Sequence, residues 1–430
     1  MDRSPRGRHY FSHNPMALLQ FTADNRDYRR HRSSGVEFTR AVRLGVSMRS
    51  IWLGVVISQV TLRPLRTIVG MTTIATVLFG AWNAYADQRG DALDAAIPTA
   101  MQKASVAGAI VGIWQGGHAP YVRTFGERNV ATREPMAPDL YMRIGSTSKT
   151  FTVTAMLLLA DQGKLGLDDP IDRYVIGVPS GNQITLRQLA AMRSGLYNYS
   201  DETNQDLPQQ PFRQWSPREL VEVAYRHPLL FPPGSAFDYS NTNTVLLGMV
   251  VENASGQSLA SFIEQHILQP LGMTHTVFPV GAEMPAPHAR GYFKMPDGTV
   301  VDATDWNPSW GWASGNMIST LEDLRVWAHD FAMGKLLSPA MKRERDQFMP
   351  APQEGDGALY GLAIENQNGW IGHNGNTMSY MAYPYYLPSE GITMVVLLNS
   401  GVDIPGSWAM MQDITRIITP NNLWPGLPKQ

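Results

Sequence analysis

The chain reads Gly-Ser-Thr-Ser-Lys over residues 145–149 and continues into 150–162, a segment that is apolar on almost every side. This pattern predicts a buried helix. A serine at the start of such a helix lies where free backbone N–H groups and the positive end of the helix dipole favour an alkoxide and an oxyanion. Lys149 follows Ser146 by one helical turn, so its amine is expected to reach the serine oxygen. Because burial lowers the pKa of a lysine, a neutral amine is expected to be available as a base.

The Ser-x-x-Lys spacing is a weak signal by itself. It occurs about once or twice by chance in a chain of this length, and serine is a common helix cap. A lysine in an otherwise apolar helix, however, has no reason to leave water unless it has a role inside the protein. The presence of Lys149 in this helix therefore favours a catalytic interpretation. Two further motifs contain candidate residues for the same site.

The first of these motifs is a turn-rich loop over residues 231–241, which carries Tyr239 and Asn241 ahead of a predicted helix at 245–252. Two side chains at this spacing on a loop can point into one cleft. A phenol there relays a proton between serine and leaving group, and an amide orients a substrate carbonyl. The alternative is that Tyr239 packs and Asn241 caps the helix, which is the better interpretation of an isolated Tyr-x-Asn pair.

The second motif is a histidine, His373, bracketed by glycines in the run 370–376 ahead of a strand-like segment that ends at Tyr386. Glycines in a strand allow a ligand to approach the backbone closely. His373 is expected to supply a hydrogen bond or a titratable positive charge, and N–H groups of the strand to complete an oxyanion hole. The alternative is an ordinary surface histidine near a turn.

Composition excludes several classes of protein. The chain has 430 residues, 43% of them hydrophobic, with a formal net charge of -2 and no cysteine. A chain of this length and apolar content buries a large core. Without cysteine it has no disulfide framework, thiol nucleophile or thiolate metal site. Because no basic footprint is visible, nucleic acid is not an expected partner.

The first 86 residues are rich in arginine and are predicted to form an N-terminal extension with a signal peptide. An apolar stretch at 68–82 precedes a small-x-small pattern that ends at Ala86, the predicted cleavage site. The stretch is shorter than the roughly 20 residues that span a bilayer, so a cleaved signal is favoured over an anchor. A second apolar run at 51–60 leaves open a true start downstream, for example at Met48. The protein is therefore expected to be secreted, periplasmic or associated with the cell envelope, and to contact a membrane only through an uncleaved leader.

Residues 87–430 are expected to form one globular unit of two interleaved parts. A hairpin is predicted from the apolar runs 106–114 and 120–125, which flank a glycine-containing turn. Residues from 146 to about 290 are predicted to be mostly helical. The chain then returns to short strand-like runs, the clearest at 391–398. The helical stretch is thus an insertion between strands.

Taken together and in this order, the three motifs resemble the serine beta-lactamase and penicillin-binding protein superfamily. The resemblance is closest to the branch that contains class C beta-lactamases, D-alanyl-D-alanine carboxypeptidase of the Streptomyces type, D-aminopeptidases and related esterases, a group similar to peptidase family S12. It covers roughly residues 100–400. It implies an α/β (α+β) fold of the beta-lactamase/transpeptidase type, in which an antiparallel sheet is flanked by helices and a mostly helical domain is inserted. The active site then lies in the cleft between the two parts.

The resemblance also implies the roles of the catalytic residues. Ser146 is acylated by the substrate, while Lys149 and Tyr239 share the work of general base and general acid. It implies no metal and no organic cofactor. The expected partner is a small peptide, an ester or a beta-lactam, with peptidoglycan as a further candidate.

Five residues are expected to bind the substrate on the same grounds. Asn241 holds the substrate amide, and His373 takes the place of the lysine in the Lys-Thr-Gly element of relatives. Asn374 and Gly375 complete this element. The backbone N–H of Asn376 forms the oxyanion hole together with that of the nucleophile.

Four residues depart from the pattern of relatives in this branch, two of them from that of its carboxypeptidases. Those enzymes usually have threonine where Asn374 stands. They also carry a basic residue, which helps to hold the peptide carboxylate, where this chain has Glu365. Met192 and Arg193 stand where relatives often have His-Thr. The changes at Asn374 and Glu365 weaken the case for a strict D-Ala-D-Ala carboxypeptidase, whereas nothing in the sequence explains the change at Met192 and Arg193.

The expected function is transfer of an acyl group to water, from an amide or ester of the cell envelope, through an acyl-serine. A D-alanyl-D-alanine carboxypeptidase or D-peptidase is the first expectation. A broad esterase or a beta-lactamase of the same fold is the alternative. A non-catalytic receptor that binds penicillin or peptidoglycan is the alternative from another class.

Overall fold

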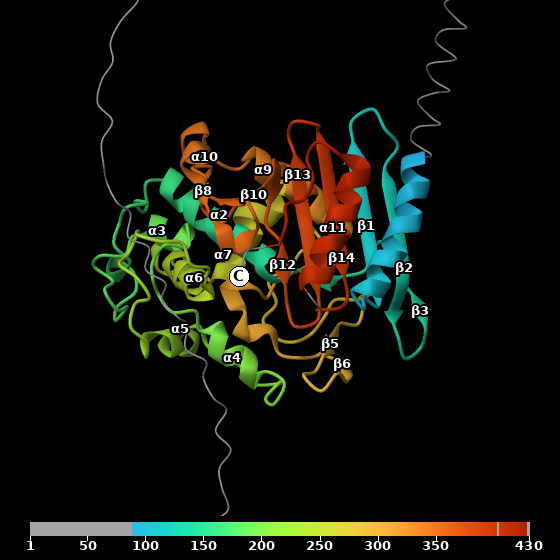
Figure 1. Cartoon of the computed structure of the whole chain (residues 1–430). Coiled ribbons are helices and arrows are strands. Elements are labelled where there is room, and N and C mark those ends of the chain that lie inside the picture. Colours follow the sequence, from blue (N-terminus) through green and yellow to red (C-terminus); the bar gives the residue numbers. More distant parts are fainter. Residues whose placement is uncertain (1–87, 402–403, 428–430) are drawn as a thin grey trace, which may run out of the picture. The chain divides into compact units, whose positions relative to one another are not determined.

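A ten-stranded antiparallel sheet forms the centre of the part that the computed structural model describes, residues 88–401 and 404–427. The strands follow the order β3-β2-β1-β14-β13-β11-β10-β9-β8, and β12 also pairs with β13 (Figure 1). Their bounds are β1 (Gly108–Gln115), β2 (Tyr121–Asn129), β3 (Glu134–Pro135), β8 (Met349–Pro350), β9 (Leu359–Tyr360), β10 (Glu365–Gln367), β11 (Trp370–Gly372), β12 (Gly375–Asn376), β13 (Met381–Leu387) and β14 (Ile392–Leu398). The predicted antiparallel sheet is thereby confirmed.

The middle of the sheet is made by β1 and β14, which pair from Ala109 opposite Leu398 to Gln115 opposite Ile392. Every residue of β14 is buried, which explains its unbroken apolar sequence. A strand alternates its side chains between two faces, so a strand covered on both faces has no solvent side that calls for polar residues.

Helices cover both faces of the sheet (Figure 1). On one face, helical residues 88–103 and α11 (Ile404–Ile418) pack on β1, β13 and β14, and Trp408 contributes to this core. On the other face, α9 (Leu321–Met333) contacts β13 and β14, and its Trp327 belongs to the larger core that includes Val395. This second core continues from the sheet into the helical part.

The helical part lies between β4 (Met142–Arg143) and β5 (Tyr292–Lys294), where every element of the described structure is helical. The α-helices of this stretch are α2 (Ser148–Asp161), α3 (Leu186–Ala190), α4 (Ser200–Asp206), α5 (Pro217–Tyr225), α6 (Asn241–Ser255), α7 (Leu259–Ile263) and α8 (Gln269–Leu271). In Figure 1, α3 to α6 lie to one side of the sheet. The predicted helical stretch from 146 to about 290 has this secondary structure.

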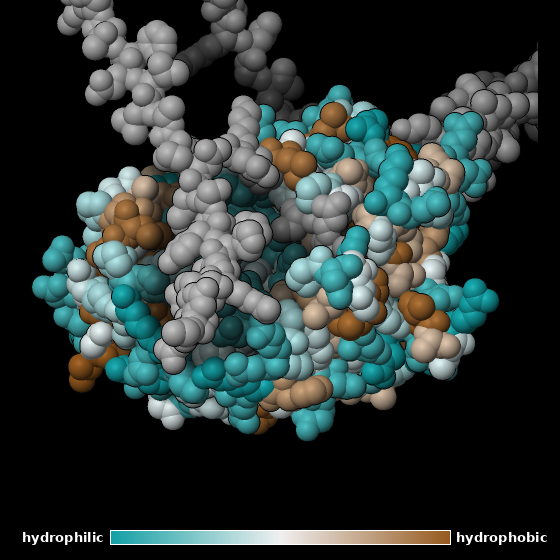
Figure 2. Space-filling model, turned by 60° about the horizontal axis from the view of Figure 1, so that its bottom comes forward, coloured by the Kyte–Doolittle hydropathy of each residue, from teal (hydrophilic) through white to brown (hydrophobic). Residues whose placement is uncertain are grey.

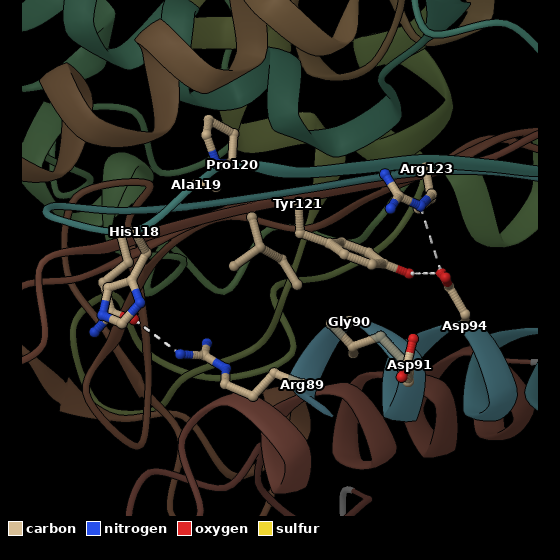
Figure 3. Close-up of a pocket in the computed structure, with 12 residues that line it drawn as sticks. Arg89, Gly90, Asp91, Asp94, His118, Ala119, Pro120, Tyr121 and Arg123 are labelled. Carbon is tan, nitrogen blue, oxygen red and sulfur yellow. Dashed lines mark hydrogen bonds and ion pairs between the residues drawn. The ribbon is translucent and has the colours of Figure 1, made fainter. Parts of the chain in front are cut away.

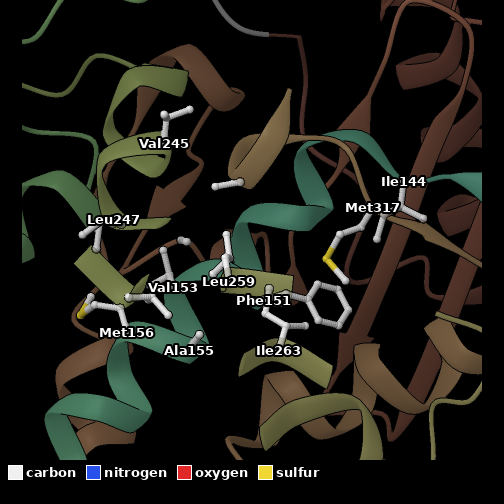
Figure 4. Close-up of a cluster of buried hydrophobic side chains, with 14 of the residues drawn as sticks. Ile144, Phe151, Val153, Ala155, Met156, Val245, Leu247, Leu259, Ile263 and Met317 are labelled. Carbon is white, nitrogen blue, oxygen red and sulfur yellow. The ribbon is translucent and has the colours of Figure 1, made fainter. Parts of the chain in front are cut away.

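The helix that follows the Ser-x-x-Lys run is the centre of the helical core. In α2, all residues of the first two and a half turns, Ser148 to Leu157, are buried. Val153 and Met156 of α2 lie among Val245 and Leu247 of α6 (Figure 4). A helix packed on nearly all sides is held rigidly, so the residues at its start have a fixed position.

The remaining elements are β6 (Val300–Asp302), β7 (Ile318–Ser319), which pairs with β4, and α10 (Pro339–Arg345). Apolar residues on the face shown in Figure 2 are scattered among hydrophilic ones. Within residues 88–401 and 404–427, no helix has the length and apolar character needed to cross a bilayer. The predicted signal segment, 1–86, lies outside the described residues.

Candidate active site

Ser146 and Lys149 are joined by a hydrogen bond. Ser146 lies in a short 3-10 turn, η1 (Gly145–Thr147), directly before α2. The Nζ atom of Lys149 is 3.0 Å from Ser146 Oγ, and it also donates to the carbonyl oxygen of Ser314 at 2.9 Å. The ammonium is fully buried, with 0% of Lys149 exposed. The predicted contact between the amine and the serine oxygen is therefore present.

The surroundings of Lys149 favour its neutral form. Burial lowers the pKa of Lys149 to about 7, against the opposing effect of the Glu354 and Glu365 charges. The ring of Tyr239 lies over the amine, with 4.9 Å between Nζ and the ring centroid. At neutral pH a substantial share of Lys149 is thus an uncharged amine, which can accept a proton from the serine.

Tyr239 presents a buried hydroxyl beside the serine. Burial raises the pKa of Tyr239 well above its ordinary value, Glu354 adds to the shift, and the nearby Ser146 side chain opposes it. The phenol oxygen makes no hydrogen bond of ordinary geometry to any residue that the structure describes. A protonated hydroxyl beside Ser146 can donate to a group that enters the site.

The loop that carries Tyr239 is held by backbone contacts. The Asp238 N–H donates to the Met192 carbonyl oxygen at 2.9 Å, and the Tyr239 N–H donates to Gln353 Oε1 at 3.2 Å. Met192 has a φ of 58° and is completely buried in a small cluster with Tyr360. Met192 therefore serves as packing beneath Tyr239, which gives the departure at this position a structural reason.

Asn241 begins α6 and faces α4. Its side-chain Nδ2 donates to Ser200 Oγ at 2.9 Å, and its backbone N–H donates to Asn198 Oδ1 at 3.0 Å. Among the described residues, no hydrogen bond connects Asn241 to Ser146 or Lys149. Its role in holding a substrate amide stays a prediction.

Two glycines let the third motif approach the nucleophile turn. A Cβ atom at Gly375 would lie 1.8 Å from the carbonyl oxygen of Ile144, and one at Gly145 would lie 2.6 Å from the Asn376 backbone nitrogen. Gly145 also has a φ of 51°, which favours glycine. The backbones of η1 and β12 are thus in direct contact. This contact places the Asn376 backbone nitrogen against Gly145, the residue before Ser146, and its role in an oxyanion hole stays a prediction.

His373 lies behind the site and is buried, with 2% exposed. Its Nε2 is 3.0 Å from the Tyr360 hydroxyl, and its Nδ1 is 2.6 Å from the Asn374 carbonyl oxygen. Since the hydroxyl is the donor on one side and acceptors face the other, we assign the proton to Nδ1. Burial lowers the pKa of His373, an effect that the Glu365 charge opposes. Of the two roles expected of His373, a hydrogen bond or a titratable positive charge, burial favours the hydrogen bond, and its part in binding a substrate stays a prediction.

Glu365 is the site residue whose position sequence reasoning missed. It had been considered only as an obstacle to binding a substrate carboxylate, yet it is completely buried behind the third motif, 3.2 Å from His373 Nδ1. A signal for this position exists in Asn368-Gly369, a turn with φ values of 54° and 93°. Asn-Gly between two strand-like runs predicts a tight hairpin, and this hairpin places Glu365 opposite Gly372.

The described structure also has cavities that none of the predicted site residues line. One of about 210 Å³ is lined by residues of the helical segment 88–103 and the β1–β2 connection, among them Arg89, Asp94 and Tyr121 (Figure 3). It contains none of the predicted site residues. Within residues 88–401 and 404–427, no cluster of three or more His, Asp or Glu side chains is arranged to hold a metal ion.

Comparison with known proteins gives a consistent set of relatives. A family model described as Beta-lactamase matches residues 93–407. The protein Flp of Staphylococcus aureus (strain MW2) is 27% identical over 317 residues, which are 71% of this chain and 62% of Flp. The chain thus spans less than two thirds of the length of this relative.

Two solved structures superimpose over 77% of this chain and 99% of their own. The D-stereospecific amidohydrolase from a Streptomyces species has a TM-score of 0.69 at 28% identity. The D-amino acid amidase from Ochrobactrum anthropi SV3, complexed with L-phenylalanine amide, has a TM-score of 0.69 at 26% identity. The similarity to both covers the sheet and the helical part.

Proposed function

The chain belongs to the beta-lactamase family, within the superfamily of serine hydrolases, and from this premise we propose that it hydrolyses an amide bond through an acyl-enzyme formed on Ser146. The observation that carries the proposal is the 3.0 Å contact between Lys149 Nζ and Ser146 Oγ in a setting that lowers the pKa of the lysine to about 7. A serine needs such a base to become a nucleophile near neutral pH.

In the proposed acylation step, neutral Lys149 takes the proton of Ser146 as Oγ attacks the substrate carbonyl. The negative charge on the carbonyl oxygen is met by the backbone N–H groups of Ser146 and Asn376. The bond to the leaving amine breaks as Tyr239 gives that nitrogen its proton. Lys149, whose Nζ lies 4.9 Å from the Tyr239 ring centroid, then returns the proton to the phenolate.

Deacylation repeats these transfers with water as the nucleophile. Water attacks the acyl carbonyl and gives its proton to the base, and the bond to Ser146 Oγ breaks as the serine regains a proton. The products are a carboxylic acid and an amine, and the enzyme returns to its first state.

We propose D-amino acyl amides or D-peptides as the substrate class. Similarity to the Streptomyces amidohydrolase and the Ochrobactrum amidase supports this choice. Glu365, where carboxypeptidases of the branch have a basic residue, is buried behind the motif and offers no cation to a terminal carboxylate. This favours an amidase or aminopeptidase over a carboxypeptidase. The predicted leader supports a site of action outside the cytoplasm, in the cell envelope or beyond it.

We predict that the full-length chain hydrolyses D-phenylalanine amide at least about 10-fold faster than the L-amide, because chiral recognition at a fixed acyl site separates the two by at least 1.4 kcal/mol. Release of ammonia measures both rates. D-Ala-D-Ala peptides, a short-chain nitrophenyl ester and a penicillin complete the panel. Faster turnover of D-Ala-D-Ala than of any amide would overturn the substrate assignment, and no turnover of the whole panel would overturn the proposed function.

We predict that kcat/KM rises with pH around pH 7. This rise, the acid limb of the pH profile, reflects the loss of a proton from the base. The folded-state pKa of Lys149 is lowered to about 7, so the lysine is charged and inactive as a base below this pH and neutral above it. The raised pKa of Tyr239 keeps the phenol protonated, so activity persists into the alkaline range. A pH series on the best amide measures the limb. An acid limb near the usual lysine value of about 10.4 would contradict the assignment of the base.

A further inference from the structure

We propose that Glu365 is a positioning residue of the active site, which fixes His373 and Asn374 in place and holds a negative charge close to Lys149. This inference rests on the proposed function, because it assigns a task to Glu365 within that reaction. The evidence is the set of contacts that the Glu365 carboxylate makes, which includes both His373 and Asn374.

The carboxylate of Glu365 is surrounded by hydrogen-bond donors. One oxygen is 3.2 Å from His373 Nδ1, and the Asn374 Nδ2 donates to both oxygens at 3.4 Å. Gln367 Nε2 donates at 3.1 Å, and the Tyr385 hydroxyl from β13 donates as well. Three side chains, Asn374, Gln367 and Tyr385, thus donate hydrogen bonds to an acid with 0% exposure, and His373 lies against it. These contacts hold the carboxylate of Glu365 in one position beside His373 and Asn374.

These contacts continue to the nucleophile. Thr147, next to Ser146, donates its hydroxyl to the His373 carbonyl oxygen at 3.0 Å. The Asn376 backbone nitrogen follows in β12, in contact with Gly145. A shift of His373 or Asn374 therefore shifts the predicted oxyanion donor. A displacement of about 1 Å at such a group costs roughly 10²-fold in rate.

The negative charge of Glu365 also raises the pKa of Lys149. The other groups that face the amine are Ser146, Tyr239, His373 and Glu354. His373 is neutral at pH 7, and Tyr239 keeps its proton. Burial, reinforced by the Glu365 charge, raises the pKa of Glu354 to about 8, and no described residue donates a hydrogen bond to its carboxyl group. Of the two acids whose charges oppose the loss of the proton from Lys149, Glu365 is the one whose carboxylate is held by side-chain donors.

The test compares Glu365→Gln with Glu365→Asp in the full chain, on the amide that the wild type hydrolyses best. The glutamine variant removes the charge, so the pKa of Lys149 falls further and the acid limb moves to lower pH. Its kcat is expected to fall about 10- to 100-fold through misplacement of the third motif. The aspartate variant keeps the negative charge, but its shorter side chain does not reach His373 and Asn374. Its kcat is therefore expected to fall, while its acid limb stays at the pH of the wild type.

Glu354 requires a further variant. In Glu365→Gln the charge next to Glu354 is gone, so Glu354 is expected to ionise at lower pH. The negative charge of Glu354 then raises the pKa of Lys149 again in part. The double variant Glu354→Gln/Glu365→Gln is therefore expected to show the full displacement of the acid limb, about one pH unit. Asp323→Asn is the matched control, because Asp323 is also a buried carboxylate, with 4% exposed, and is not among the groups that shift Lys149. Its acid limb should equal that of the wild type.

Thermal unfolding of each variant shows whether it is folded. A folded Glu365→Gln protein with wild-type kcat and acid limb overturns the inference while the proposed function stands. If this variant does not fold, Glu365→Asp carries the test, and a wild-type kcat there overturns the positioning role. A wild type without turnover on any substrate removes the proposed function itself, which is a distinct outcome.

Discussion

The Ser146→Ala protein will lose hydrolysis of every substrate that the wild type turns over, with kcat lower by at least about 10⁴-fold. In the proposed reaction Ser146 Oγ forms the bond to the acyl group, and alanine has no atom to replace it. The backbone of the turn is held by its contacts with β12, so the fold is expected to remain. Ammonia release measures kcat, and mass spectrometry of the stopped reaction detects the acyl-enzyme in the wild type alone.

Ser235→Ala is the control for this variant. Ser235 is an exposed serine on the loop that carries Tyr239, and its hydroxyl donates to the Pro232 carbonyl oxygen at 2.7 Å. Its kcat should be that of the wild type. Unchanged turnover in Ser146→Ala would show that the nucleophile is another group.

Lys149→Met is expected to lower kcat by about 10³- to 10⁴-fold, the range for loss of a general base. Methionine has nearly the length of lysine and fills the same buried space without an amine. Ser146 then keeps its hydroxyl but has no group at 3.0 Å to take its proton. The measurement is kcat at pH 8, where most of the wild-type lysine is neutral, together with the rate at which a fluorophosphonate labels Ser146.

Lys164→Met serves as the matched control, since Lys164 is exposed just beyond the end of α2. It should label at the wild-type rate. If Lys149→Met labelled as fast as this control and retained its kcat, the base would have to be another residue, and Tyr239 would be the next candidate.

Short-range patterns in the sequence predicted the buried helix and the contact between Ser146 and Lys149, whereas the assignment of Ser146 as nucleophile also needed the two distant motifs. Ser146 and Lys149 lie within one turn, so their contact follows from helical spacing, and the apolar character of 150–162 predicts the burial that lowers the pKa of the lysine. Tyr239 is far from both in sequence. Its arrival beside Lys149 followed from the resemblance to a family, because no local pattern fixes how a loop packs on a distant helix.

The part of the site that the sequence left open depends on strand pairing. From the sequence, His373 could supply either a hydrogen bond or a titratable charge, because no local pattern shows whether its ring is buried. The structure buries it between Tyr360 of β9 and Glu365 of β10, strands that reach it through the hairpin at Asn368. An interpretation that had used this turn would have placed an acid beside the histidine.

The pairing of β1 with β14 has a consequence for how the chain acquires its structure. The middle of the sheet joins Ala109 to Leu398, partners from near opposite ends of the described chain, which gives the fold a high contact order. Folds of this kind form slowly, because the entropy of closing a long loop is lost before the pairing compensates for it. The sheet cannot close before the ribosome has made β14. A chain whose sheet stays open until β14 has been made remains able to pass through an export channel, which fits a protein whose work is proposed to lie outside the cytoplasm.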